Sequence, residues 1–287
     1  MRLSLSGIFC IVLAGCGTST QNPAPQPVAK DAKDMSLVEL ERAKADGDAQ
    51  AGYELGRRYY FAQAVPQDYA KAAEFFRFAA ERDHRDAMYN LGVLYQHGQG
   101  VPVDERESFR WYLRAAEQRQ PDAAKFVALM FKLGVGVEQN YPEAMRWFKK
   151  SAEFGNTAAY TSIAQMYLNG WGVAQDNDRA REWYLKAADA GDENAYGPLY
   201  LIYFSGRGVP ANDAEARKWL AKLDATESGR ALLSQVLAEM ARTNPDDMYG
   251  FGKYLEDRGR ADQAQTVMEL AAKSGSLRAS DWLATHR

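Results

Sequence analysis

The feature that most constrains this chain is a repeat of 36 residues that runs through the middle of the sequence without an insertion or deletion. Its marker is a pair of glycines one residue apart: Gly98 with Gly100, Gly134 with Gly136, Gly170 with Gly172 and Gly206 with Gly208. The first unit has Ala62 and Ala64 at these two positions. Alanine, aromatic and Asp/Asn columns keep the same step, so we divide the chain into units 50–85, 86–121, 122–157, 158–193 and 194–229.

Each unit has the pattern of two antiparallel helices. In the second unit Ala87, Leu91 and Leu94 recur on one face of a helix, which predicts a first helix with one buried side. Gly98 then suits the left-handed residue that ends a helix, and Asp104 suits the N-cap of a second helix. No single helix pair can bury both of its faces, so we expect the units to stack into a solenoid.

The same columns continue outside the regular units. Residues 36–46 begin with the pattern of a capping box and predict a lone second helix that opens the stack. Residues 246–287 match a degenerate helix pair followed by one capping helix. Residues 230–245 have a helical pattern but fit no column of the repeat. Within the fifth unit, Pro198 predicts a kinked or shortened first helix, and Tyr200 replaces a small packing residue.

These units, for example DAMYNLGVLYQHGQGVPVDERESFRWYLRAAEQRQP, resemble Sel1-like repeats, which are relatives of the tetratricopeptide repeat. The resemblance is close over residues 50–229 and looser over 36–287. It implies an all-α fold, a right-handed α-solenoid of stacked antiparallel helix pairs, and a role in binding or assembly. Sel1-like proteins include bacterial lipoproteins that organise complexes of the cell envelope, so the resemblance also implies an envelope role.

The amino-terminal sequence predicts that the protein is exported to the cell envelope. Residues 1–15 carry Arg2 followed by an apolar run that is too short for a membrane span, which needs roughly 20 residues, and has the proportions of a secretory signal. The segment from Leu13 to Cys16 resembles the lipobox of bacterial lipoproteins, which implies cleavage before Cys16 and acylation of that residue. The residue after it, Gly17, implies sorting to the outer membrane by analogy with enteric lipoproteins. Residues 16–35 predict a flexible, proline-rich linker to a periplasmic domain.

The sequence offers no motif for catalysis, a metal or a cofactor. Its three histidines form no zinc motif, and Cys10 leaves with the predicted signal, so only the lipidated Cys16 would remain. No serine-hydrolase motif occurs, and a formal net charge of -3 gives no basic excess for nucleic acid. We therefore predict a protein that is not an enzyme, needs no cofactor or metal and binds no nucleic acid.

The predicted binding site is the concave groove lined by the first helices, which in tetratricopeptide-like stacks face inward. The columns that packing does not need are Tyr53, Arg57, Tyr60, Tyr89, Val93, Gln96, Lys125, Leu129, Lys132, Thr161, Gln165, Leu168, Leu201 and Phe204. Their mixture of tyrosines, cations and aliphatic residues predicts an extended peptide with acidic and apolar side chains.

The function expected from these features is a membrane-anchored periplasmic scaffold that binds envelope proteins or peptides. Two alternatives remain at this point: a structural lipoprotein associated with peptidoglycan or exopolysaccharide, and a cell-wall-modifying enzyme. The first requires aromatic groove residues exposed in a row, and the second requires converging carboxylates or histidines. The middle residue of the fourth glycine pair, Trp171, is a further position where a partner could make contact.

Overall fold

The computed structural model describes residues 31–206 and 208–286, and all regular secondary structure in this part of the chain is helical. Residues 1–15, which we predict to be a signal, lie outside the described residues. Cys16 and most of the predicted linker lie outside them as well. The α-helices are α1 Leu37–Ala45, α2 Ala49–Phe61, α3 Tyr69–Ala80, α4 Arg85–His97, α5 Glu105–Glu117, α6 Pro121–Leu133, α7 Tyr141–Glu153, α8 Ala159–Asn169, α9 Asn177–Asp189, α10 Tyr196–Ser205, α11 Asp213–Ala225, α12 Glu227–Thr243, α13 Pro245–Asp257, α14 Ala261–Lys273 and α15 Leu277–Thr285.

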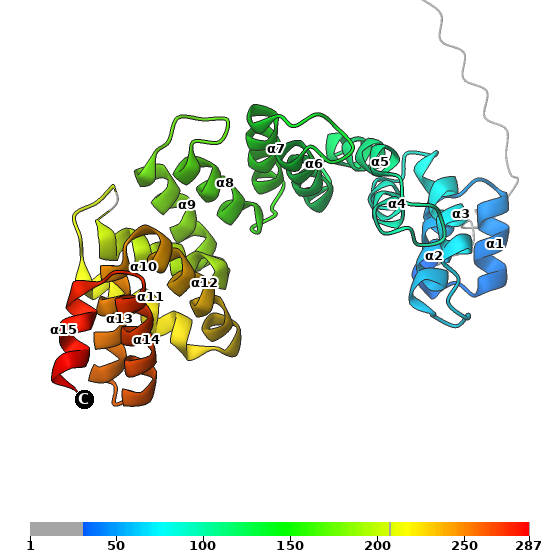
Figure 1. The fold of residues 1–287 in the computed structure, drawn as a ribbon. Helices are drawn as coiled ribbons and strands as arrows, with labels where there is room; N and C mark the ends of the chain where they lie inside the picture. Colours follow the sequence, from blue (N-terminus) through cyan, green and yellow to red (C-terminus); the bar gives the residue numbers. More distant parts are fainter. Residues whose placement is uncertain (1–30, 207, 287) are drawn as a thin grey trace, which may run out of the picture.

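The helices pack in sequential pairs, beginning with α2 against α3 and continuing through α10 against α11. Figure 1 shows these pairs following one another around an open arch, in which α2, α4 and α6 lie nearer the inner side than α3, α5 and α7. One hydrophobic core runs through the stack from α3 to α15, so each pair buries its apolar faces against its neighbours. This confirms the predicted all-α solenoid of stacked helix pairs.

The two glycines of each pair have different structural roles. The first ends the first helix: Gly98 adopts φ 66° and donates its backbone N–H to the carbonyl of Leu94. The second, Gly100, lies against the first turn of the second helix of the preceding unit. A Cβ atom at Gly100 would lie 2.2 Å from the carbonyl oxygen of Tyr69, which leaves no room for any side chain. The sequence predicted a chain reversal here, and the structure adds a close contact between successive units.

The turn between paired helices is held by two further side chains in most units. The predicted Asp/Asn column caps every second helix by accepting backbone N–H groups, at Asp68, Asp104, Asn140, Asp176 and Asn212. In three units a glutamine just before this cap donates its amide to a carbonyl near the end of the first helix, from Gln67 to Tyr60, Gln139 to Lys132 and Gln175 to Leu168, at 2.8 to 2.9 Å. These bonds fix the end of the first helix, where groove residues lie.

Small residues in the first helices allow the paired helices to approach closely. A Cβ atom at Gly92 would lie 2.7 Å from the ring of Tyr112, which packs against it from α5. In the fifth unit Tyr200 fills this column and is 2% exposed, and α10 has 10 residues where α6 has 13. The helix begins only two residues before Pro198, since a proline is tolerated in the first turn, so the predicted shortening is observed.

The two ends of the stack differ from the regular units. At the amino end Ser36 and Glu39 form the predicted capping box of α1. A short 3-10 helix, Ala32–Asp34, precedes it and buries Ala32 against the fold, so these three residues at the end of the predicted linker segment are helical. At the carboxyl end α12 is an extra helix that begins directly after α11 and contacts α10, α11 and α13. This places the segment that fitted no column of the repeat.

We predict that Gly100→Ala lowers stability by more than the usual cost of a left-handed alanine, which is about 1–2 kcal/mol. The reason is the added clash with the Tyr69 carbonyl. Gly259→Ala is the matched control, because Gly259 has the same φ of 72° as Gly100 but would place its Cβ in open space. The exposed Ala64, with φ 61°, provides the reverse test, and Ala64→Gly should raise stability by roughly 0.5–1 kcal/mol. Urea unfolding measures all three variants; equal losses at Gly100 and Gly259 would contradict the close contact.

His84 predicts a pH dependence of stability. Its Nδ1 accepts the backbone N–H of Ala87 as the N-cap of α4, and its Nε2 lies 2.9 Å from Oε1 of Gln50, so the fold uses the neutral ring. Burial lowers the pKa of His84, although the nearby Asp86 acts in the opposite direction. As the pH falls through about 6.5 the unfolded chain takes up the proton first, so stability is full above this pH and declines toward the lowered folded pKa.

The measurement is the urea midpoint between pH 7.5 and pH 5.5, values chosen on either side of the usual histidine pKa of about 6.5. His84→Asn is the matched variant, since asparagine also caps helices but does not titrate in this range. The midpoint of the variant should fall less than that of the wild type. The same pH profile for both proteins would show that His84 is not responsible.

Candidate partner-binding groove

The predicted groove residues lie on the first helices α2, α4, α6, α8 and α10. Most of them are half-buried, as Tyr89 and Val93 are, whereas the alternate positions Met88, Leu91 and Leu94 of the same helix are fully buried. The first helices therefore divide their side chains between the core and one accessible face. This division is what the columns of the repeat predicted.

At the amino end of the groove the side chains are largely engaged with each other. The ring of Tyr53 stacks on His84 at 4.3 Å between centroids, and the Tyr60 hydroxyl donates to Oε1 of Gln99. Arg57 forms an ion pair with the buried Glu54 at 3.3 Å. The charge of Arg57 is thus partly neutralised, which the sequence pattern did not indicate.

The middle of the groove holds the two predicted lysines on α6. Lys125 lies over the ring of its neighbour Phe126, and Nζ of Lys132 lies 4.7 Å from the ring centroid of Trp171 in the next unit. Burial lowers the pKa of Lys132, because its ammonium group is partly removed from water. Trp171 also stacks on Tyr141 at an interplanar angle of 11°. The variable middle residue of the glycine pair is therefore held by two neighbours.

Two predicted groove residues at the carboxyl end are occupied by contacts within the fold. Thr161 is 8% exposed, and its hydroxyl donates to Oδ2 of Asp192, so it joins the fourth unit to the fifth. Phe204 packs against α13, where a Cβ at Gly250 would lie 2.4 Å from its ring. Both residues therefore make packing contacts within the solenoid, and their contact with a partner stays a prediction.

Three other predicted residues, Gln165, Leu168 and Leu201, come together around a hollow between α8 and α10. Arg242, which α12 contributes, also lines this hollow. The sequence did not predict Arg242 as a groove residue, because residues 230–245 fit no column of the repeat and could not be placed in the stack. Its only sequence signal was the loss of register itself.

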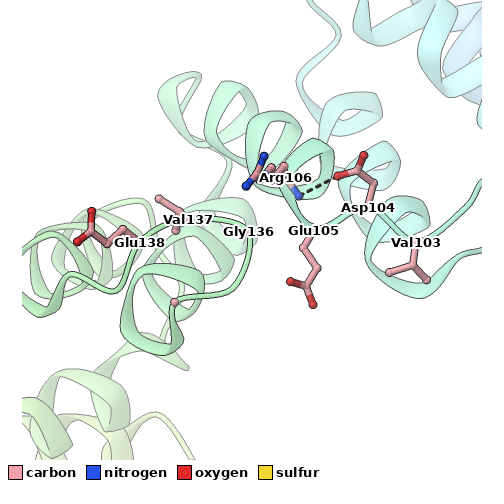
Figure 2. Close-up of a pocket in the computed structure, with 8 residues that line it drawn as sticks. Val103, Asp104, Glu105, Arg106, Gly136, Val137 and Glu138 are labelled. Carbon is pink, nitrogen blue, oxygen red and sulfur yellow. Dashed lines mark hydrogen bonds between the residues drawn. The ribbon is translucent and has the colours of Figure 1, made fainter.

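A further hollow, of about 780 Å³, lies between the turns of units two and three. Figure 2 shows that the carboxylates of Asp104, Glu105 and Glu138, which line it, point in different directions. Within residues 31–206 and 208–286, no cluster of His, Cys, Asp and Glu has the arrangement of a metal site. No helix in that same part of the chain has the length and hydropathy needed to cross a membrane.

Comparison with known proteins assigns the repeat. The sequence model of the Sel1 repeat matches residues 49–84, 85–119, 121–156, 157–192 and 193–223. A search of curated proteins found no match.

Two solved structures share this fold. A Sel1 repeat protein from Oxalobacter formigenes is 31% identical, with a TM-score of 0.62 over 64% of this chain and 75% of that one. A protective antigen present in uropathogenic Escherichia coli strains, which displays an SLR fold, is 30% identical with a TM-score of 0.66. That match covers 88% of this chain but only 59% of the antigen. Since the matched repeats make up more than half of the sequence, the chain belongs to the Sel1 repeat family, whose α-solenoids are suited to protein–protein interaction.

Proposed function

We propose that this protein is an envelope scaffold, anchored to the outer membrane through an acylated Cys16, whose first helices bind an extended protein segment in the periplasm. The observation that carries the binding part is the repeated division of each first helix into a buried column and an accessible one. Such a surface continues from unit to unit and suits an extended partner, because side chains recur at a constant step along the groove.

The charge of the groove favours a segment with acidic side chains. Lys125 and Lys132 lie on the same helix, and neither forms an ion pair with a carboxylate among the described residues. Acidic side chains of a bound segment can therefore approach either lysine without displacing a carboxylate of the fold. Rim charges of this kind mainly affect the rate of association and its dependence on salt.

The alternative of a polysaccharide- or peptidoglycan-binding lipoprotein has less support. It requires a row of aromatic rings with free faces, but Tyr53 has one face on His84, and Tyr60 meets Tyr69 edge to face. Trp171 is likewise stacked on Tyr141. Peptide binding therefore agrees better with the groove.

The binding surface is tested by the double variant Lys125→Glu with Lys132→Glu. We expect it to capture markedly less partner in cross-linking pulldowns from intact cells, since two attractions for acidic side chains become repulsions. The melting temperature should fall by only a few degrees, because the two stabilising contacts that are lost, Lys125 over Phe126 and Lys132 over Trp171, are each worth about 0.5–1 kcal/mol. Arg146→Glu on α7 is a control for an added negative charge outside the first helices. Undiminished capture would exclude this part of the groove.

Sedimentation of the same proteins with purified sacculi distinguishes the alternative. If the wild type sediments with sacculi and the pulldown yields no protein, a cell-wall role replaces the proposed one.

The membrane anchor is tested separately by Cys16→Ser. The variant should lose acylation and move from the membrane fraction to the soluble fraction, because several acyl chains, at about 0.8 kcal/mol per buried CH₂, supply the whole proposed anchor. Cell fractionation and metabolic labelling with a fatty acid measure the two effects. Cys10→Ser is the matched control and should remain lipidated. A membrane-bound, unlabelled wild type would disprove lipid attachment at Cys16.

A further inference from the structure

A hollow lies where α8, α10 and α12 meet, and we refer to it as the α12 hollow. It consists of two adjoining pockets of about 390 Å³ and 220 Å³ that share Gln165, Pro198 and Leu201 in their walls. Figure 1 shows α12 on the inner side of the arch beside α10. The extra helix therefore closes one side of a space that the regular repeat would leave open.

The floor of the α12 hollow is apolar. Leu168, Pro198, Leu201 and Ile202 line the larger pocket, and Leu232 and Val236 add apolar surface from α12 to the smaller one. Leu168 and Leu201 are only half-buried, so part of this surface faces water. Small ligand sites in proteins are typically concave and apolar, with few polar groups, and span about 300–1,000 Å³. A bulky apolar side chain is the occupant that matches this shape and surface.

The two pockets of the α12 hollow carry opposite charges: Arg242 lines the larger pocket and Glu193 lines the smaller one. Arg242 and Trp171 line the larger pocket, and the ammonium group of Lys132 lies over the Trp171 ring. Among the described residues no carboxylate pairs with Lys132, and burial is the cause that lowers its pKa. The carboxylate of Glu193 lies instead at the smaller pocket, where it accepts the Thr226 hydroxyl at 3.0 Å. Arg242 is the cation that lines the larger pocket, so this pocket favours an acidic group beside its apolar surface.

We infer that the α12 hollow is the anchor site of the groove, where a bulky apolar side chain of the bound segment inserts and an adjacent acidic residue meets Arg242. This inference rests on the proposed function and specifies the partner's chemistry. Binding energy at interfaces commonly concentrates in one such desolvated pocket.

The test is selection from a phage-displayed library of random linear peptides on the immobilised full-length protein in detergent. Selected peptides should share an acidic residue next to a bulky apolar one. Leu201→Ser and Arg242→Gln should each weaken the selected peptides by about tenfold or more, the loss expected when one good contact of about 1.4 kcal/mol is removed. Arg242→Gln should also reduce the dependence of binding on salt, because one screened charge is lost.

The matched controls are Leu133→Ser and Arg110→Gln, which change the same residue types at exposed positions outside the hollow. Both should bind as the wild type does, and thermal unfolding confirms that each variant is folded. The peptides could bind Leu201→Ser and Arg242→Gln normally but lose affinity for the double variant Lys125→Glu with Lys132→Glu. This result would support the proposed groove and show that the anchor site is wrong. If no peptide is selected, or if selected peptides bind all variants equally, both the anchor site and the proposed groove are wrong.

Discussion

The architecture depends on the contact between the second glycine of each pair and the first turn of the preceding second helix. At Gly100 and Gly136 the backbones approach so closely that a Cβ would lie 2.2 Å from a carbonyl oxygen. This contact links the length of the loop to the distance between successive units, which agrees with the constant 36-residue step of the five units. The exposed Ala64 occupies the corresponding place in the first regular unit, where a side chain is accommodated.

Regular stacking decides where a partner can bind. Within the repeat, contacts between neighbouring units engage groove residues, as in Tyr53 on His84 and Thr161 with Asp192. A hollow with an apolar wall forms where regularity ends, because α12 does not continue the pairing of α10 with α11 and lies against α10 instead. The proposed anchor site thus lies where the degenerate part of the chain begins, while the regular part provides a stable frame.

Much of the fold could be predicted because its determinants are local and recur. Positive φ at Gly98, the cap at Asp104 and the apolar face of the first helix follow from residue types at fixed spacing. The groove was predicted less completely. Thr161 and Phe204 share their columns with accessible residues, and only their neighbours Asp192 and Gly250 reveal that they are engaged.

By itself the sequence determined the helix pairs, their 36-residue step, the caps and the face of each first helix that packing leaves accessible. These properties depend on backbone preferences and hydrophobic periodicity within one unit. Only the tertiary structure decided that the second glycine contacts the preceding unit, that Lys132 lies over Trp171, and that α12 places Arg242 in the same hollow as Leu201. The reason is physical: each of these contacts joins residues from different units, and its geometry is set by how the units stack.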